Sequence, residues 1–155
     1  MKINKTKKGL LVFVFFGLLF SVGSIAVAAI NISNSPVTSS TSPRIAVDFQ
    51  GYIHAIWVEL SGSSSGDLFY SRGNKEATQW TTPVNLSNSN AVYCSSLMMC
   101  GIDVDGSNRI YVIWVDGSQI KMRICSSGSW ENAFVLDNGL VFDAPKVAVT
   151  PEGDI

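Results

Sequence analysis

One eight-residue segment of the sequence occurs twice in similar form. Ile53–Leu60 reads IHAIWVEL, and Ile110–Gly117, fifty-seven positions later, reads IYVIWVDG. Both lines are rich in β-branched and aromatic residues, which favour β-strands over helices. A short chain that repeats a whole strand in this way is built from repeated structural units, so the repeat constrains the fold more than any other feature.

Each line follows a stretch of alternating apolar residues and a short polar turn. The alternation of apolar and polar residues predicts a strand, and the turn predicts that this strand pairs with the repeated line as a hairpin. A third copy, PKVAVTPEGDI, starts at Pro145. The apolar pairs are Ile45/Val47, Ile102/Val104 and Val147/Val149, and the turns are DFQG, DGSN and TPEG.

Two further strands complete each repeat. Third strands are predicted over Asp67–Gly73 and Gln119–Cys125, because both segments alternate in character. Fourth strands follow Trp80 and Trp130, and they are predicted over Asn85–Ser87 and Val135–Asp137. The phrase Asn31–Ser35 repeats Asn85–Ser89 with one conservative change, so a fourth strand is also expected directly after the N-terminal segment.

The repeat length selects the architecture. Asp48, Asp105 and Thr150 hold equivalent positions 57 and 45 residues apart, which is the length of a four-stranded antiparallel propeller blade. The prediction is an all-β, partial β-propeller over 30–155, with repeats at 43–96, 100–143 and, in part, 145–155. About two and a half blades do not close a ring, which needs about four to eight. We therefore expect either a piece of a longer protein or several copies that assemble one ring as a homo-oligomer.

The N-terminal segment, 1–29, has the pattern of a signal peptide. Four lysines precede an uncharged apolar stretch, Leu10–Ala29, and Ala26-Val27-Ala28 supplies the small residues of a cleavage site. An uncleaved membrane anchor is the alternative, since about 20 apolar residues span a bilayer. Either reading predicts an extracellular or cell-surface location, with membrane contact only through this segment.

The charge and the metal-ligand pattern exclude several classes of function. Without 1–29 the chain has seven basic and twelve acidic residues, so nucleic acid is not an expected partner. Asp103–Asn108 has the look of a calcium loop but lacks its glycine and glutamate, and it aligns with the hairpin turns instead. His54, the only histidine, is expected to pack within a strand. Neither a metal nor a cofactor is predicted.

Cys94 and Cys100 are close enough in the sequence to form a disulfide that closes a small loop.

The repeats resemble the sialidase-like propellers that are built from BNR, or Asp-box, repeats. The lines that carry the resemblance are Trp57-Val58-Glu59, Phe69-Tyr70-Ser71-Arg72 with Trp80, and Trp114-Val115-Asp116 with Trp130. In that family the boxes are structural turns, and the enzymes use three arginines, a Tyr-Glu pair and an acid/base aspartate. Of the four arginines of this chain, only Arg44 is expected on the ligand-binding rim, so the catalytic residues are unknown. The tryptophans are expected to pack between blades.

The predicted binding residues lie where the strand order brings loops to one rim. They combine opposed charges with an aromatic ring, which suits a sugar or a peptide, although local ion pairs would give the same pattern. The residues are Arg44, Glu59, Tyr93, Asp116 and Lys146. The predicted function is an exported module that binds carbohydrate or a surface protein. The alternatives are part of a secreted sialidase-like glycoside hydrolase and an inactive fragment.

Overall fold

The computed structural model describes residues 29–35, 39–93, 100–139 and 144–155. Within these ranges the chain forms strands and no helix, so the all-β prediction is confirmed. The strands are β1 (Ser40–Val47), β2 (Ile53–Leu60), β3 (Ser65–Gly73), β4 (Val84–Asn85), β5 (Val92–Tyr93), β6 (Cys100–Val104), β7 (Ile110–Asp116), β8 (Gln119–Ser126), β9 (Ser129–Trp130) and β10 (Phe134–Asp137). No helix in the described part of the chain is long and apolar enough to span a bilayer. The predicted signal segment lies almost entirely outside the described residues.

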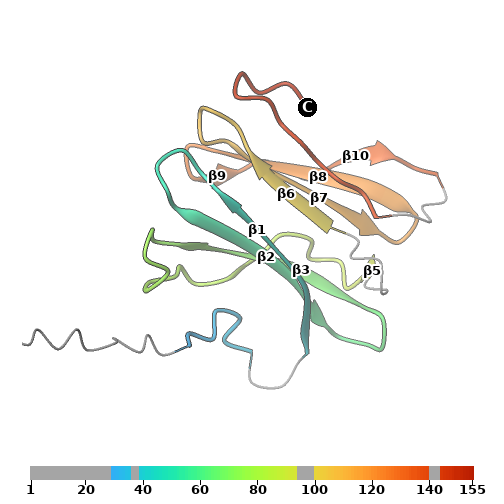
Figure 1. The fold of residues 1–155 in the computed structure, drawn as a ribbon. Helices are drawn as coiled ribbons and strands as arrows, with labels where there is room; N and C mark the ends of the chain where they lie inside the picture. Colours follow the sequence, from blue (N-terminus) through green and yellow to red (C-terminus); the bar gives the residue numbers. More distant parts are fainter. Residues whose placement is uncertain (1–28, 36–38, 94–99, 140–143) are drawn as a thin grey trace, which may run out of the picture.

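The strands form two antiparallel units with the same internal order (Figure 1). In the first unit, β1 pairs with β2, β2 with β3 and β3 with β4. In the second unit, β6, β7, β8 and β10 pair in the same order, and β9 adds a short pairing to β8. The short strand β5 pairs with both β3 and β7 and so joins the two units into one open sheet. The four strands predicted for each of the two full repeats are confirmed, with boundaries shifted by a few residues.

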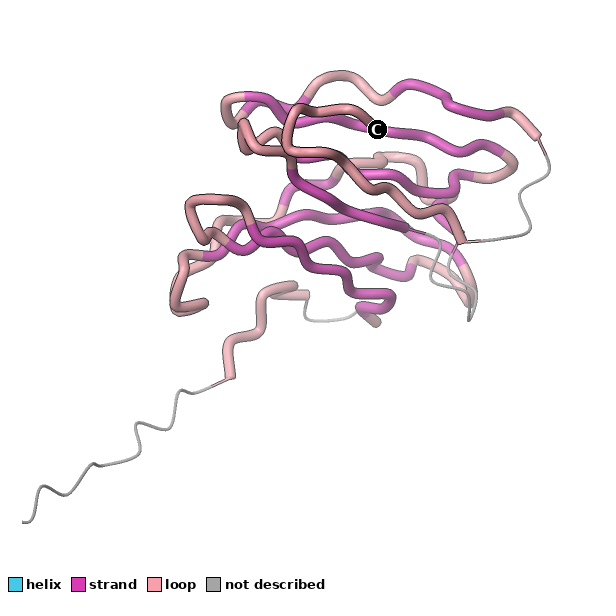
Figure 2. The backbone as a smooth tube through the Cα atoms, turned by 45° about the horizontal axis from the view of Figure 1, so that its top comes forward, coloured by secondary structure: helices cyan, strands magenta, loops and turns pink. Residues whose placement is uncertain are grey.

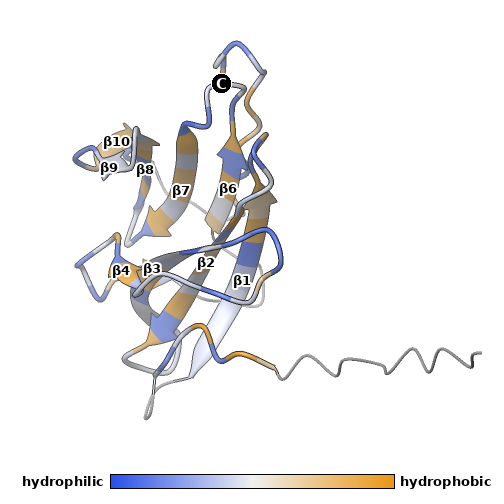
Figure 3. Cartoon of the chain, turned by 90° about the vertical axis from the view of Figure 1, so that its left-hand side faces the viewer, coloured by the Kyte–Doolittle hydropathy of each residue, from blue (hydrophilic) through white to orange (hydrophobic). Residues whose placement is uncertain are grey.

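The core lies between the two units, because each unit turns one apolar face toward the other. Residues that are directly opposite in an antiparallel pair share a face, so the register assigns every side chain to one side of its sheet. Apolar bands on the strands of both units are visible in Figure 3. The first unit contributes Ile56, Val58, Leu68, Tyr70 and Leu86, and the second contributes Cys100, Val104, Ile110, Val112, Trp114 and Cys125. Most of these side chains are fully buried.

The hairpin turn is the same in all three copies of the repeat. In each, the first residue exchanges backbone hydrogen bonds across the turn, as Asp48 does with Tyr52 and Gly51. Asp105 makes the same bonds in the second copy and Thr150 in the third. Their side chains also accept a hydrogen bond from the backbone N–H four residues later, at 2.8, 2.9 and 3.1 Å. The turn predicted over 105–108 is therefore confirmed, and Asp105 serves as its cap.

Two predicted strands are absent, and both predictions were wrong. Asn31–Ser35 contains a bend and pairs with no described strand, although Asn31, Ile32 and Ser33 line a small pocket beside β1 and β2. In the third copy, Pro145–Val149 runs beside β6 without a ladder, since the Val149 N–H donates to the Asp103 side chain at 2.8 Å instead of to a backbone carbonyl. Figure 2 shows both segments as loops. Val147 and Val149 nevertheless pack on Tyr111, Ile113 and Met122 of the second unit.

Candidate functional site

A cavity of about 750 Å³ lies between the two units, at the end of the sheets where the hairpin turns sit. Its walls come from both units, because the two turns and the adjoining ends of the sheets converge there. The lining includes Asp48, His54, Tyr70 and Arg72 from the first unit, and Asn108, Arg109, Cys125 and Trp130 from the second. This volume falls within the range of small-ligand sites, about 300 to 1,000 Å³.

A chain of hydrogen-bonding side chains forms part of the cavity wall. His54 Nδ1 lies 2.9 Å from the Tyr70 hydroxyl, and His54 Nε2 lies 3.3 Å from Asp48 Oδ2. Burial lowers the pKa of His54, although its contact with Asp48 works in the opposite direction. Burial also raises the pKa of Tyr70. The imidazole is therefore neutral at neutral pH, and it links the Asp48 side chain to a protonated phenol.

Two arginines bring positive charge to the cavity. Arg72 is exposed, and its guanidinium lies 3.8 Å from the centre of the Tyr52 ring, a cation–π distance. Arg109 Nε donates to Asp105 Oδ2 at 2.6 Å, and this hydrogen bond raises the pKa of Arg109. The charge of Arg109 is therefore matched locally. Arg72 has no aspartate or glutamate within ion-pair distance among the described residues.

An aromatic ring and a thiol complete the wall. Trp130 is partly exposed and meets Tyr70 of the other unit edge to face, with ring centres 5.0 Å apart. This contact confirms the predicted packing of Trp130 between repeats. Trp80, by contrast, packs on Gly73 of its own unit. Cys125 is buried, and burial raises the pKa of its thiol, so it is a neutral and weakly reactive group.

Of the five side chains predicted for the rim, Glu59, Tyr93 and Asp116 lie at the opposite end of the sheets. The register places them in neighbouring rows, because Glu59 is opposite Asp67, Tyr93 is opposite Ser65 and Val92 is opposite Asp116. Arg44 lies within β1 and donates to the Cys100 carbonyl at 3.4 Å. Lys146 is exposed at the start of the third copy. The structure therefore brings Glu59, Tyr93 and Asp116 to one end of the sheets and places Arg44 in mid-strand. That these residues bind a ligand stays a prediction.

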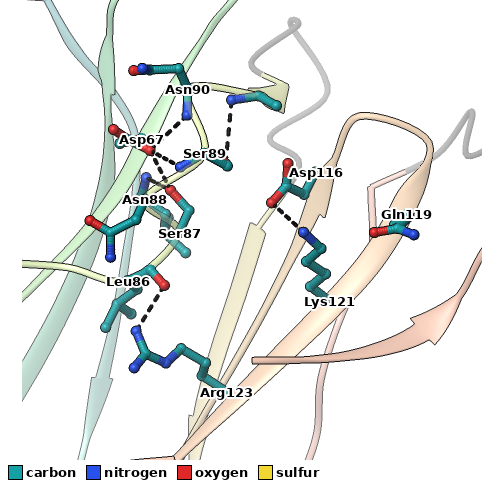
Figure 4. Close-up of polar contacts among 12 residues, drawn as sticks. Asp67, Leu86, Ser87, Asn88, Ser89, Asn90, Asp116, Gln119, Lys121 and Arg123 are labelled. Carbon is teal, nitrogen blue, oxygen red and sulfur yellow. Dashed lines mark hydrogen bonds and ion pairs between the residues drawn. The ribbon is translucent and has the colours of Figure 1, made fainter. Parts of the chain in front are cut away.

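Polar side chains of the rim hold the fold together, as Figure 4 shows. Asp67 accepts hydrogen bonds from the Ser87 hydroxyl and from the Ser89 and Asn90 N–H groups at 2.7, 2.8 and 2.9 Å. Burial alone would raise the pKa of Asp67, but these bonds outweigh it and the pKa is lowered. Lys121 pairs with Asp116 at 2.9 Å. Of these residues only Asp116 was predicted to bind a ligand, and Lys121 matches its charge.

The neighbouring acidic residue of the rim is also engaged. Glu59 accepts hydrogen bonds from the Trp57 indole at 2.7 Å and from the Ser40 hydroxyl at 3.3 Å. Arg123 reaches from β8 to the Leu86 carbonyl of the first unit at 2.9 Å (Figure 4). Burial lowers the pKa of Arg123. No group of three metal-ligating side chains gathers anywhere in the described ranges.

The cavity was not predicted from the sequence, although the sequence contains one signal of it. His54 was correctly expected to pack within a strand, and it is 3% exposed. It replaces Tyr111 of the second repeat, and both side chains bond the aspartate of their own turn, the Tyr111 hydroxyl at 3.1 Å. Tyr70, however, corresponds to Met122 in the second unit. The signal in the sequence was therefore the pair His54 and Tyr70, two polar side chains at strand positions where the second repeat has Tyr111 and Met122.

Comparisons with known proteins give limited information. No family model matches the chain, and no curated protein matches it. Among solved structures, the Hadza microbial sialidase Hz136 superposes on 63% of this chain with a TM-score of 0.39 and 11% sequence identity. The match spans 24% of the sialidase. This weak similarity is to a small part of a larger enzyme, whose activity is not carried over to this chain.

Proposed function

We propose that this chain is an exported β-propeller module that binds carbohydrate in the cavity between its first two units. The observation that carries the proposal is the composition of the cavity wall. It combines a partly exposed indole, Trp130, with an exposed guanidinium, Arg72, and a row of small polar side chains. The polar members include Gln50, Thr81, Thr82, Ser107, Asn108 and Ser126.

This combination fits a sugar better than an apolar ligand. A sugar presents hydroxyl groups that both donate and accept hydrogen bonds, and it presents C–H faces that pack on aromatic rings. Hydroxyl and amide side chains match the hydroxyl groups in both roles, and the Trp130 ring offers an aromatic surface with a polar edge. The two units each supply part of the wall, so the site depends on the repeated architecture.

Three further observations support the export and propeller parts of the proposal. The segment 1–29 has the pattern of an export signal. The two units have the same strand order, and all three copies have the same turn. The third copy packs on the second unit as the second packs on the first, which is how blades follow one another in a propeller.

Titration of the purified chain with a panel of soluble oligosaccharides, neutral and acidic, tests the proposal by calorimetry. We expect binding to at least one class of sugar. Arg72→Ala should weaken that binding about tenfold to a hundredfold, since a hydrogen bond to a charged group contributes about 1.5 to 3 kcal/mol. Arg72 is exposed, so the variant should fold, and its unfolding temperature checks this.

Lys146→Ala is the matched control, because Lys146 is an exposed cation at the opposite end of the sheets. It should bind sugar as the unaltered protein does. Loss of binding in Lys146→Ala with normal binding in Arg72→Ala would move the site to the rim. An absence of binding to every sugar would overturn the proposal. Release of free sugar during the titration would favour the hydrolase alternative.

A further inference from the structure

The outer face of the first unit, defined by Ile45 and Val47 of β1, is apolar and mostly exposed, with residues 30–33 lining a small pocket beside Ile45. The side chains of these residues are 69% and 58% exposed. They are opposite Ala55 and Ile53 in the ladder and so share one side of the sheet. That side faces away from the second unit, because Ala46, the residue between them, packs against the core between the units.

The other two copies of the repeat show what covers this pair. In the second copy, Ile102 and Val104 hold the same positions, and they pack in the core against the first unit. In the third copy, Val147 and Val149 pack on Tyr111, Ile113 and Met122 of the second unit. In both cases the apolar pair of one copy lies against the inner face of the copy before it. The equivalent contact is missing only at Ile45 and Val47.

The opposite end of the molecule presents the matching surface. Burial alternates along the third copy, where Val147 and Val149 face the second unit and Ala148 is exposed between them. Ala148 corresponds to Ala46, which packs in the same core cluster as Val104. The turn of the third copy is already formed. Figure 1 shows this segment on the side of the second unit that is remote from the first.

We propose that two copies of this chain associate head to tail, with residues 145–155 of one copy docked on the Ile45 and Val47 face of the other. This contact between copies would repeat the contact that Ala46 makes with the second unit within one copy. It therefore uses the same kind of surface that already packs between units. A contact between two different surfaces leaves one of each free on the resulting dimer. Further copies therefore add until a ring closes.

Light scattering coupled to size-exclusion chromatography tests the proposal on the purified chain. The unaltered protein should run as an oligomer whose apparent mass rises with concentration. Ile45→Lys and Ala148→Lys should each weaken association about tenfold or more, because each forces an ammonium group against an apolar surface. Val135→Lys, at a 42% exposed position on β10, is the control and should associate normally.

A mixture of the two blocked variants distinguishes this geometry from a symmetric one. Ile45→Lys keeps its 145–155 surface intact, and Ala148→Lys keeps its Ile45 face intact. Head-to-tail docking therefore predicts that the mixture forms a dimer of one copy of each and grows no further. A monomeric unaltered protein, normal association of Ile45→Lys, or no dimer in the mixture would each overturn the proposal.

Discussion

Replacing the turn aspartate of the second repeat tests how much one capped turn stabilises this fold. The Asp105 side chain is fully buried and accepts four hydrogen bonds. The donors are the Ser107 and Arg109 N–H groups, each at 2.9 Å, Arg109 Nε at 2.6 Å and the Tyr111 hydroxyl at 3.1 Å. Asp105→Ala removes both carboxylate oxygens, and with them all four hydrogen bonds, and it leaves the buried Tyr111 hydroxyl without this partner.

The expected loss in the free energy of unfolding is about 3 to 5 kcal/mol, because the turn N–H groups regain water while the Tyr111 hydroxyl does not. The other copies calibrate this estimate. Asp48→Ala removes two backbone bonds and one longer contact to His54, so about 2 to 3 kcal/mol is expected. Asp105→Thr should also cost about 2 to 3 kcal/mol, since Thr150 shows that a hydroxyl keeps the bond to the N–H four residues on.

Urea denaturation followed by tryptophan fluorescence measures these differences, with the unaltered protein and all three variants at neutral pH. The slope of free energy against urea should stay constant if only the folded state is affected. If Asp105→Ala is no more destabilising than Asp48→Ala, the bonds to Arg109 Nε and Tyr111 contribute nothing and the reasoning fails. Because the pKa of Asp105 is lowered, its contribution should be complete above about pH 4 and should fade in acid as the carboxylate protonates.

Three further predictions follow from single contacts. Burial lowers the pKa of His54 in the folded chain, so the unfolded chain takes up a proton there more readily. The unfolding temperature should therefore drop as pH falls below about 6.5. The drop should be smaller in His54→Gln. Gly66→Ala should prevent folding at 37 °C, as judged by circular dichroism, because its new methyl group would overlap the Glu59 carbonyl. Gly62→Ala should be close to neutral, because its methyl group would make only an ordinary contact with the Ser65 hydroxyl at 3.9 Å. Arg123→Met should lower the free energy of unfolding by about 1.5 to 3 kcal/mol in urea titrations, since it removes the bond to the Leu86 carbonyl; an unchanged midpoint would show that this bond does not hold the units together.

The local structure was predictable because it depends on short-range patterns. Alternation at Ile45/Val47 and Ile102/Val104, with a polar turn after each pair, is sufficient for the hairpins. The third turn formed even without a strand before it, because the Thr150 side chain caps it through neighbouring residues. The strand predicted at Asn31–Ser35 failed for the opposite reason. A strand needs a partner, and a sequence match to Asn85–Ser89 does not supply one.

The candidate site was less predictable because it depends on pairings across the sheets. His54 meets Tyr70 only through the β2–β3 register, and Tyr70 meets Trp130 only after the two units pack. No local pattern encodes either contact. At the rim, the spacing of Glu59 and Asp116 in the sequence gave no sign that Glu59 accepts a hydrogen bond from Trp57 or that Asp116 pairs with Lys121.

The hydrogen bonds that join the two units can form only after the second unit has been synthesised. Arg44 bonds Cys100, Phe49 bonds Asn108 and Leu86 bonds Arg123, across 56, 59 and 37 positions of chain. Ribosomes add about 5 to 20 residues per second, so the first unit waits several seconds with Ile56 and Val58 uncovered. During that interval the apolar face that the second unit later covers is open to solvent. Substitutions that slow the pairing of β6 to β8 should therefore reduce the yield of protein before they change anything that the finished molecule does.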